Sequence, residues 1–321
     1  MKSLKIGSHK KLFEKDSLNK KIDIDYVSEI KNLKRIKNAV ILCHYYQSPE
    51  VQELADYLGD SLYLAQCASK VTHKIIILAG VHFMAETAKL MSPEKKVLLP
   101  DMKAGCSLSS SITGEDVRNL KKKYPGVPVV SYVNTSADVK SETDVCCTSA
   151  NAVKIVKSLG VKRVIFLPDD FLAKYVASQT DVEIISWKGT CEVHEQFNDQ
   201  EINEIRRSNP GIKIIAHPEC PPDVISASDF AGSTSGMIKY VKDNQPKKVM
   251  MVTECSMSDN VQIDNPNVEF IRPCNLCPHM KKITLPKVLN CLENETNEIL
   301  MEDEVIEKAR KSVERMTEIG R

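Results

Sequence analysis

Three cysteines stand at nearly equal intervals along the chain. Cys106, Cys191 and Cys277 each follow shortly after an apolar run, and they are separated by 85 and 86 residues. Three thiolates gathered by a threefold arrangement suit an iron–sulfur cube that leaves one iron open to act as a Lewis acid. Zinc is the alternative, and it would need a further ligand or an open position; His194 and His279 each lie close to one of the cysteines.

Three hydroxyl residues are also regularly spaced. Each follows the end of an apolar run by the same separation of 17 residues, in the pairs His44 and Ser61, Tyr132 and Ser149, and His217 and Thr234. Each hydroxyl lies in a turn-like context that leads into helical spacing. We therefore expect it to cap a helix start, where the free N–H groups favour anions. The spacing predicts a pocket for a small substrate with several negative groups.

Residues suited to proton transfer lie beside these positions. Glu219 comes two residues after His217, at the position that Tyr46 and Asn134 occupy in the other two repeats. We expect Glu219, Tyr46 and His217 to be catalytic, because a carboxylate, a phenol and an imidazole can exchange protons inside a cavity. Tyr132 and Asn134 are suited to hydrogen-bond a substrate carboxylate.

Short apolar runs alternate with helical segments and would position these residues. They are Ala39–Cys43, Lys74–Leu78, Lys96–Leu99, Val127–Tyr132, Arg163–Leu167, Glu183–Trp187, Lys213–Ala216, Lys248–Val252 and Val268–Ile271. Strands this short and apolar indicate parallel sheets covered on both faces. Ligands bind beyond the carboxyl ends of such strands, which is where the candidate residues lie.

The regular spacing indicates a triplicated chain. We predict an α/β fold of three pseudo-threefold-related α/β/α units, with short parallel sheets around a central active site. The expected divisions are an N-terminal lead-in and helix (1–35), three repeats (36–121, 122–207 and 208–290) and a C-terminal helix (291–321). In that helix the residues with amphipathic spacing are Val305, Ala309, Val313 and Met316.

The composition argues against several classes of protein. The chain has 321 residues with 44 basic and 43 acidic side chains, and a formal net charge of +1 argues against a nucleic-acid or anionic-membrane binder. No apolar run is long enough to span a bilayer. The 11 cysteines do not indicate a secreted disulfide framework, because their count is odd and the Met1 end lacks an apolar secretion core. We expect a cytoplasmic protein with metal, cluster or thiol chemistry.

The remaining cysteines carry weaker signals. Cys274 and Cys277 form a C-x-x-C pair that could be redox active, and Cys274 could form a disulfide with Cys277 on oxidation. The others are expected to be small buried apolar residues: Cys43, Cys67, Cys146, Cys147, Cys220, Cys255 and Cys291.

Seven motifs together carry a family resemblance from about Ala39 to Leu285. They are H-Y-Y-Q (44–47), G-D-S-L (59–62), Y-V-N-T-S-A (132–137), C-C-T-S-A-N-A (146–152), H-P-E-C (217–220), G-S-T-S-G-M (232–237) and C-P-H-M-K (277–281). With these motifs the sequence resembles the quinolinate synthase family. The segment before the last cysteine is shorter than the cysteine-rich run of some members, which puts a thiol-switch role for it in doubt.

The resemblance implies a specific chemistry. It implies a triangular fold of three α/β/α units and a [4Fe-4S] cluster bound by Cys106, Cys191 and Cys277. The implied reaction condenses iminoaspartate with dihydroxyacetone phosphate to quinolinate, with loss of phosphate and two waters, which suggests a functional link to an aspartate-oxidising enzyme. Glu219 would act as a base and Tyr46 would assist proton transfer. The implied substrate-binding positions are His44, Ser61, Tyr132, Val133, Asn134, Ser149, His217, Pro218, Glu219 and Thr234.

Two other functions stay open on the residues alone. An iron–sulfur hydro-lyase acting on a small hydroxy acid would use the same three cysteines and differ in its substrate. A non-catalytic iron or redox sensor would use the cysteines but would not need the hydroxyl, tyrosine and glutamate positions.

Overall fold

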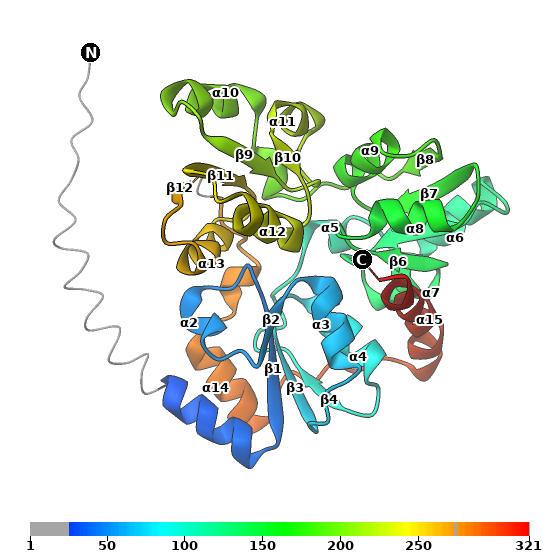
Figure 1. The fold of residues 1–321 in the computed structure, drawn as a ribbon. Coiled ribbons are helices and arrows are strands. Elements are labelled where there is room, and N and C mark those ends of the chain that lie inside the picture. Colours follow the sequence, from blue (N-terminus) through cyan, green and yellow to red (C-terminus); the bar gives the residue numbers. More distant parts are fainter. Residues whose placement is uncertain (1–25, 273–274, 321) are drawn as a thin grey trace.

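Three small parallel sheets form the framework of the molecule. The computed structural model describes residues 26–272 and 275–320, so the first 25 residues and Cys274 lie outside the described part. Each sheet has four strands, in the orders β2-β1-β3-β4, β6-β5-β7-β8 and β10-β9-β11-β12. Figure 1 shows the three α/β units arranged around a common centre. The predicted α/β class with short parallel sheets is confirmed.

The first unit follows a helical stretch at residues 26–36. Its strands are β1 (Ala39–His44), β2 (Tyr57–Gly59), β3 (Ile75–Ala79) and β4 (Lys96–Leu98). Its helices are α2 (Pro49–Gln52), α3 (Ser61–Ala68), α4 (His82–Met91) and α5 (Ser107–Ser110). β1 and β3 are buried along their whole length, which explains their uninterrupted apolar sequences.

The second unit repeats this plan. Its strands are β5 (Val129–Tyr132), β6 (Val145–Cys147), β7 (Arg163–Leu167) and β8 (Glu183–Ser186). Its helices are α6 (Gly114–Lys123), α7 (Ala137–Ser141), α8 (Ala152–Ser158), α9 (Asp170–Ser178) and the short 3-10 turn η1 (His194–Gln196).

The third unit has the same order of elements. Its strands are β9 (Lys213–Ala216), β10 (Phe230–Ala231), β11 (Lys248–Val252) and β12 (Glu269–Ile271). Its helices are α10 (Asp199–Ser208), α11 (Pro222–Ala227), α12 (Thr234–Asn244), α13 (Ser256–Asp264) and the 3-10 turn η2 (Met280–Lys282).

All nine predicted strands are present, with bounds within two residues of those expected. The sequence interpretation missed β2, β6 and β10, which each occupy one edge of their sheet. These strands have only two or three residues, too few for a period-two pattern to stand out. They are nevertheless important, because each directly precedes one of the hydroxyl-bearing segments.

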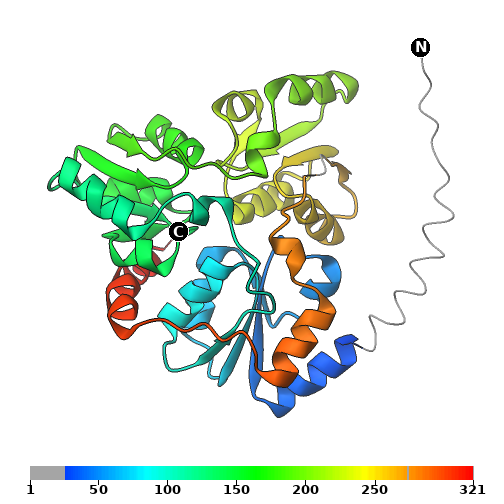
Figure 2. The same cartoon turned by 180° about the vertical axis from the view of Figure 1, so that it is seen from behind.

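Two C-terminal helices complete the ring of units. α14 (Leu285–Asn294) packs beside β3 of the first unit, and Figure 2 shows it in orange against the blue and cyan elements. α15 (Asp303–Ile319) packs on α7, β6 and α4, so it bridges the first and second units. It buries Ala309, Val313 and Met316 as its spacing predicted, whereas Val305 is half-buried.

The predicted unit boundaries fall inside helices. The divisions at 121/122, 207/208 and 290/291 would cut α6, α10 and α14. These helices each follow a candidate cluster cysteine and pack against the next unit, since α6 contacts α7, α10 contacts α11 and α14 contacts β3. We therefore propose that the units divide ahead of these three helices.

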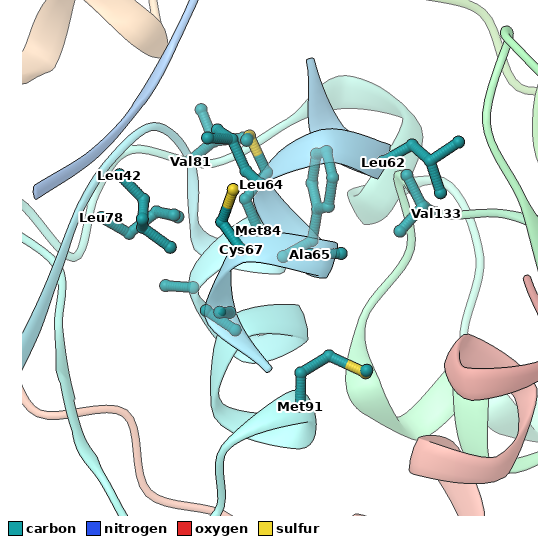
Figure 3. Packing of buried hydrophobic residues seen from close by; sticks show 14 of the residues in the cluster. Leu42, Leu62, Leu64, Ala65, Cys67, Leu78, Val81, Met84, Met91 and Val133 are labelled. Atoms are coloured by element: carbon teal, nitrogen blue, oxygen red, sulfur yellow. The ribbon is translucent and has the colours of Figure 1, made fainter. Parts of the chain in front are cut away.

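A continuous apolar core joins the first two units. Figure 3 shows Val133, from the second unit, packed beside Leu62 of α3. Two separate clusters cover the two faces of the third sheet. Within residues 26–272 and 275–320, no helix combines the length and the apolar character needed to cross a membrane.

We predict that α15 is an integral part of the fold. Met316 is fully buried on this helix, so Met316→Ala should lower the free energy of unfolding by about 2–5 kcal/mol through cavity formation. Leu300 is 77% exposed, and Leu300→Ala should change the free energy of unfolding by about 0.5 kcal/mol or less. Urea denaturation of both variants measures the difference. If the two variants unfold at the same urea concentration, the packing of α15 is not needed for stability.

Candidate active site

The carboxyl ends of the central strands face one cavity. β1 ends in His44 and β5 in Tyr132, while His217 follows β9 directly. The cavity has about 740 Å³ of unfilled space, its opening included. The predicted site residues that line it are His44, Tyr46, Ser61, Cys106, Tyr132, Asn134, Ser149, Cys191, His217, Glu219, Thr234 and Cys277.

Two predicted binding residues do not line this cavity. Val133 is buried in the apolar core of the first two units, where it packs against α3. Pro218 is buried between two cavity residues, His217 and Glu219. Both positions are implied by the family resemblance. Each lies between two cavity-lining residues, and alternate residues of an extended segment point in opposite directions, which explains why these two side chains do not line the cavity.

The expectation that the three hydroxyl residues cap helices is wrong. Asp60 caps α3 by accepting a hydrogen bond from the Tyr63 N–H, at 2.9 Å, so Ser61 is the first helical residue. Ser233 caps α12 in the same way, which leaves Thr234 at the first position. Ser149 lies two residues before Asn151, the cap of α8. Asp60 and Ser233 thus satisfy the starts of α3 and α12, and all three hydroxyl residues line the cavity.

Glu219 is a buried carboxylate of the third unit that is held by donors from the second unit. The Tyr132 hydroxyl donates to Oε1, and His194 Nδ1 lies 2.9 Å from Oε2. Burial alone would raise the pKa of the Glu219 carboxyl. The neighbouring His194 imidazole, with the hydrogen bonds from His194 and Tyr132, brings that pKa below its usual value. The group is therefore ionised and can accept a proton.

Tyr46 is linked to this carboxylate through two side chains. Its hydroxyl lies 2.7 Å from Thr253 Oγ1, which lies 2.9 Å from His194 Nε2. Burial and the Glu219 charge raise the pKa of Tyr46 well above its usual value, so the phenol keeps its proton. The chain Tyr46–Thr253–His194–Glu219 thus joins a protonated phenol to an ionised carboxylate.

Sequence reasoning did not predict this chain fully. The sequence predicts His194 only as a possible zinc ligand and gives no role to Thr253. Thr253 directly follows β11, and polar residues that follow parallel strands are the general signal that could have identified it.

His44 and His217 are held in the same way in their two repeats. The Tyr46 N–H donates to His44 Nδ1 at 3.1 Å, and the Glu219 N–H donates to His217 Nδ1 at 3.4 Å. A ring nitrogen that accepts a hydrogen bond must be unprotonated, so both imidazoles are neutral. His217 Nε2 is then the donor to Ser149 Oγ, at 3.0 Å. His217 also stacks on His194, with ring centroids 4.8 Å apart.

The three cysteines share one local geometry. Each precedes a helical turn, in α5, η1 or η2, and its sulfur accepts hydrogen bonds from the backbone N–H groups two and three residues further on. Burial raises the pKa of Cys106 to about 12, and burial also raises the pKa of Cys191 and Cys277. The N–H donors act in the opposite direction, because they stabilise a thiolate.

Contacts between the cysteine turns tie them to one another. Ser107 Oγ donates to the Thr190 carbonyl and accepts from the Glu192 N–H, both at 3.1 Å. Glu192 Oε1 also lies 2.8 Å from His279 Nε2. Each of these residues is adjacent or close to a candidate ligand. The three turns are therefore held in one place by contacts that do not use the sulfur atoms.

This donor set fits a metal cofactor. Three thiols line one cavity, and each has backbone donors that stabilise the anionic form required for coordination. Cys191, His194 and Glu219 form a mixed group whose ligand atoms all lie within 4.8 Å of one another. In that group, however, both His194 nitrogens already have protein partners in Glu219 and Thr253.

The family described as "Quinolinate synthetase A protein" matches residues 28–318 of the chain. The chain belongs to the quinolinate synthase family. It is therefore an enzyme, and the family name fits the transferase class. The predicted family resemblance is confirmed.

Similar curated proteins cover most of the chain. "Quinolinate synthase 1" of Mesorhizobium japonicum is 58% identical over 294 residues, which are 91% of either chain. "Quinolinate synthase" of Agrobacterium fabrum is 58% identical, over 92% of this chain and 86% of its own. The Xylella fastidiosa (strain 9a5c) protein of the same name is 54% identical, over 96% of this chain and 91% of its own.

The neutral imidazoles predict a pH effect on stability. Burial lowers the pKa of His44 to about 4 and that of His217 to about 3, while the unfolded chain titrates near 6.5. The unfolded state therefore binds more protons below about pH 6.5, and the free energy of unfolding falls as the pH drops from there towards 4. At about 1.4 kcal/mol per pH unit, His44 alone accounts for a loss of about 3 kcal/mol.

Replacing His44 isolates this contribution from that of the carboxylates. His44→Gln should flatten the loss of stability between pH 6.5 and 4, as measured by urea denaturation across that range. If wild type and variant lose stability in parallel, His44 is not held neutral in the folded protein.

Proposed function

We propose that this enzyme condenses iminoaspartate with dihydroxyacetone phosphate to form quinolinate, releasing phosphate and two waters. One observation carries the proposal: three half-buried thiols share a cavity with a network of carboxylate, imidazole and phenol. Membership of the quinolinate synthase family supports the identity of the product. The small anionic substrates agree with a cavity lined by hydroxyls and neutral imidazoles.

The metal centre is a [4Fe-4S] cluster bound by Cys106, Cys191 and Cys277. The equivalent turns and paired N–H donors at all three sulfurs support three chemically similar ligands. With only three protein ligands, the cluster supplies an open iron that is a Lewis acid for a substrate hydroxyl or carbonyl.

The substrate anions bind at the hydroxyl-bearing segments. Ser61 and Thr234 lie at the first positions of α3 and α12, where backbone N–H groups and the helix dipole favour carboxylate or phosphate. Ser149 and Asn134 line the cavity from the second unit. Anion sites on different units hold the two substrates next to each other. Carbon–carbon bond formation then becomes effectively intramolecular.

Glu219 and Tyr46 move the protons of the reaction. The ionised Glu219 carboxylate accepts a proton from carbon or nitrogen, and Tyr132 and His194 keep its oxygens oriented. The protonated Tyr46 phenol donates a proton to a leaving oxygen. His217 is neutral, and its Nε2–H orients the Ser149 hydroxyl at the cavity wall.

The substrate chemistry requires a partner activity. Iminoaspartate is an oxidation product of aspartate and hydrolyses readily, so we propose a functional link to an aspartate-oxidising enzyme. We also propose a cytoplasmic location. Nine cysteines of the described part of the chain are free thiols, which suits a reducing compartment; they are Cys43, Cys67, Cys106, Cys146, Cys147, Cys191, Cys220, Cys277 and Cys291.

The first test is product formation and its dependence on Glu219. Anaerobically purified enzyme should form quinolinate from oxaloacetate, ammonia and dihydroxyacetone phosphate, measured by liquid chromatography. Glu219→Gln should lower turnover by about 100-fold or more, because the amide cannot accept the proton, and should leave the cluster absorption unchanged. Glu201→Gln, on the exposed side of α10, is the matched control.

Two outcomes would contradict this proposal. Normal turnover of Glu219→Gln would remove Glu219 from the mechanism. Absence of quinolinate, together with dehydration of a small hydroxy acid, would favour the iron–sulfur hydro-lyase instead.

The second test concerns the cluster ligands. Cys191→Ser should abolish cluster assembly, so that iron and acid-labile sulfide fall from roughly four of each per chain towards zero. Cys67→Ser, a buried cysteine of α3 that is not among the cavity-lining residues, should keep the full content. An unaltered cluster signal in Cys191→Ser would refute the ligand assignment.

A further inference from the structure

The loop that carries Tyr46 is held by the third unit at several points. We call residues 45–48, between β1 and α2, the Tyr46 loop. The Tyr46 hydroxyl contacts Thr253, and the Tyr46 carbonyl accepts a hydrogen bond from Lys281 Nζ at 2.6 Å. The Tyr45 carbonyl accepts from Asn260 Nδ2 at 2.9 Å. Residues more than 200 positions away in the chain thus decide where the phenol points.

Lys281 belongs to the turn that carries a candidate cluster ligand. It lies four residues after Cys277, and its N–H donates to the Cys277 carbonyl at 3.2 Å, within the turn that includes η2. Its ammonium also donates to Ser256 Oγ at 2.6 Å and pairs with Glu254 Oε1 at 3.0 Å. The side chain is only 23% exposed, so its direction is well defined.

Glu254 links the Cys277 turn to the end of β11. Its carboxylate is completely buried and accepts hydrogen bonds from the Ser256 N–H at 2.9 Å and from the Cys277 N–H at 3.4 Å. Glu254 directly follows Thr253 at the end of β11. Two consecutive residues therefore reach both ends of Tyr46: Thr253 contacts its hydroxyl, and Glu254 pairs with the lysine that holds its carbonyl.

We propose that Lys281 and Glu254 are a positioning pair that couples the Cys277 turn to the Tyr46 loop. The pair joins the backbone of a cluster ligand to the backbone of the proton donor through one ion pair and two hydrogen bonds. A bound cluster that fixes Cys277 also fixes Lys281 and, through it, the Tyr46 carbonyl. The proposal rests on the proposed function, in which Tyr46 donates a proton and Cys277 binds the cluster.

The test must avoid leaving a buried charge without its partner. Lys281→Met alone would strand the Glu254 carboxylate in the interior, which is strongly destabilising. The double variant Lys281→Met/Glu254→Gln removes both charges and keeps an amide oxygen that can accept from the Cys277 N–H. Lys282→Met is the matched control, because the charge of Lys282 acts on Asp101 instead. Lys281→Arg tests rescue by another cation.

The kinetic readout separates positioning from general damage. The double variant should keep its iron content and KM, while kcat falls roughly 10- to 100-fold. Lys281→Arg should recover part of that loss, and Lys282→Met should equal wild type. When the double substitution is introduced into Tyr46→Phe, kcat should fall by less than about threefold further. The effects of residues that act through one group are not additive.

Hydrogen exchange supplies a readout that does not depend on activity. In the double variant, backbone amides of residues 45–53 should exchange about tenfold faster than in wild type, while those of β5 are unchanged. Removing iron with a chelator should accelerate exchange of the same residues in wild type and add nothing in the double variant.

The outcomes distinguish this proposal from the proposed function. Normal kcat and normal exchange in the double variant, with Tyr46→Phe impaired, would overturn the positioning pair and leave the proposed function intact. Normal turnover of Tyr46→Phe would overturn both the role of Tyr46 and the coupling. Loss of the cluster in the double variant, with the exchange of residues 45–53 unchanged, would assign the pair to Cys277 alone and also overturn the coupling.

Discussion

A buried negative charge sets the strongest constraint on this molecule. Glu219 is almost completely buried in a cavity that also holds three cysteine thiols, and an isolated carboxylate there would be very costly. It is tolerated because Tyr132 and His194 donate to its two oxygens. These donors come from a different part of the chain from Glu219. The pairing therefore exists only where the second and third units meet.

The threefold repeat gives the site both its framework and its chemistry. Each unit supplies a cysteine before a helical turn, so the three proposed cluster ligands are built from one local plan. The residues at the strand ends keep their place but differ in type between units. Equivalent positions hold Tyr46, Asn134 and Glu219, which are a phenol, an amide and a carboxylate. Symmetry in the backbone thus supports an asymmetric reaction.

Much of the framework could be predicted because it is local. Buried parallel strands are continuous apolar runs, and equal spacing of like residues reveals a repeat without any knowledge of contacts. The prediction failed where the local signal was too short or ambiguous. The edge strands β2, β6 and β10 are too brief to show a pattern, and Asp60 and Ser233 compete with the adjacent Ser61 and Thr234 as helix caps.

By itself the sequence determined the fold class, the three cysteines and the positions of the strand-end residues, because each depends on neighbours within one repeat. Only the tertiary structure decided which side chains act together. His194 meets Glu219, Thr253 meets Tyr46, and Lys281 reaches the Tyr46 carbonyl across unit boundaries. Such pairs join residues tens to hundreds of positions apart, and no periodicity encodes them, since their geometry arises only when the sheets pack around a common cavity.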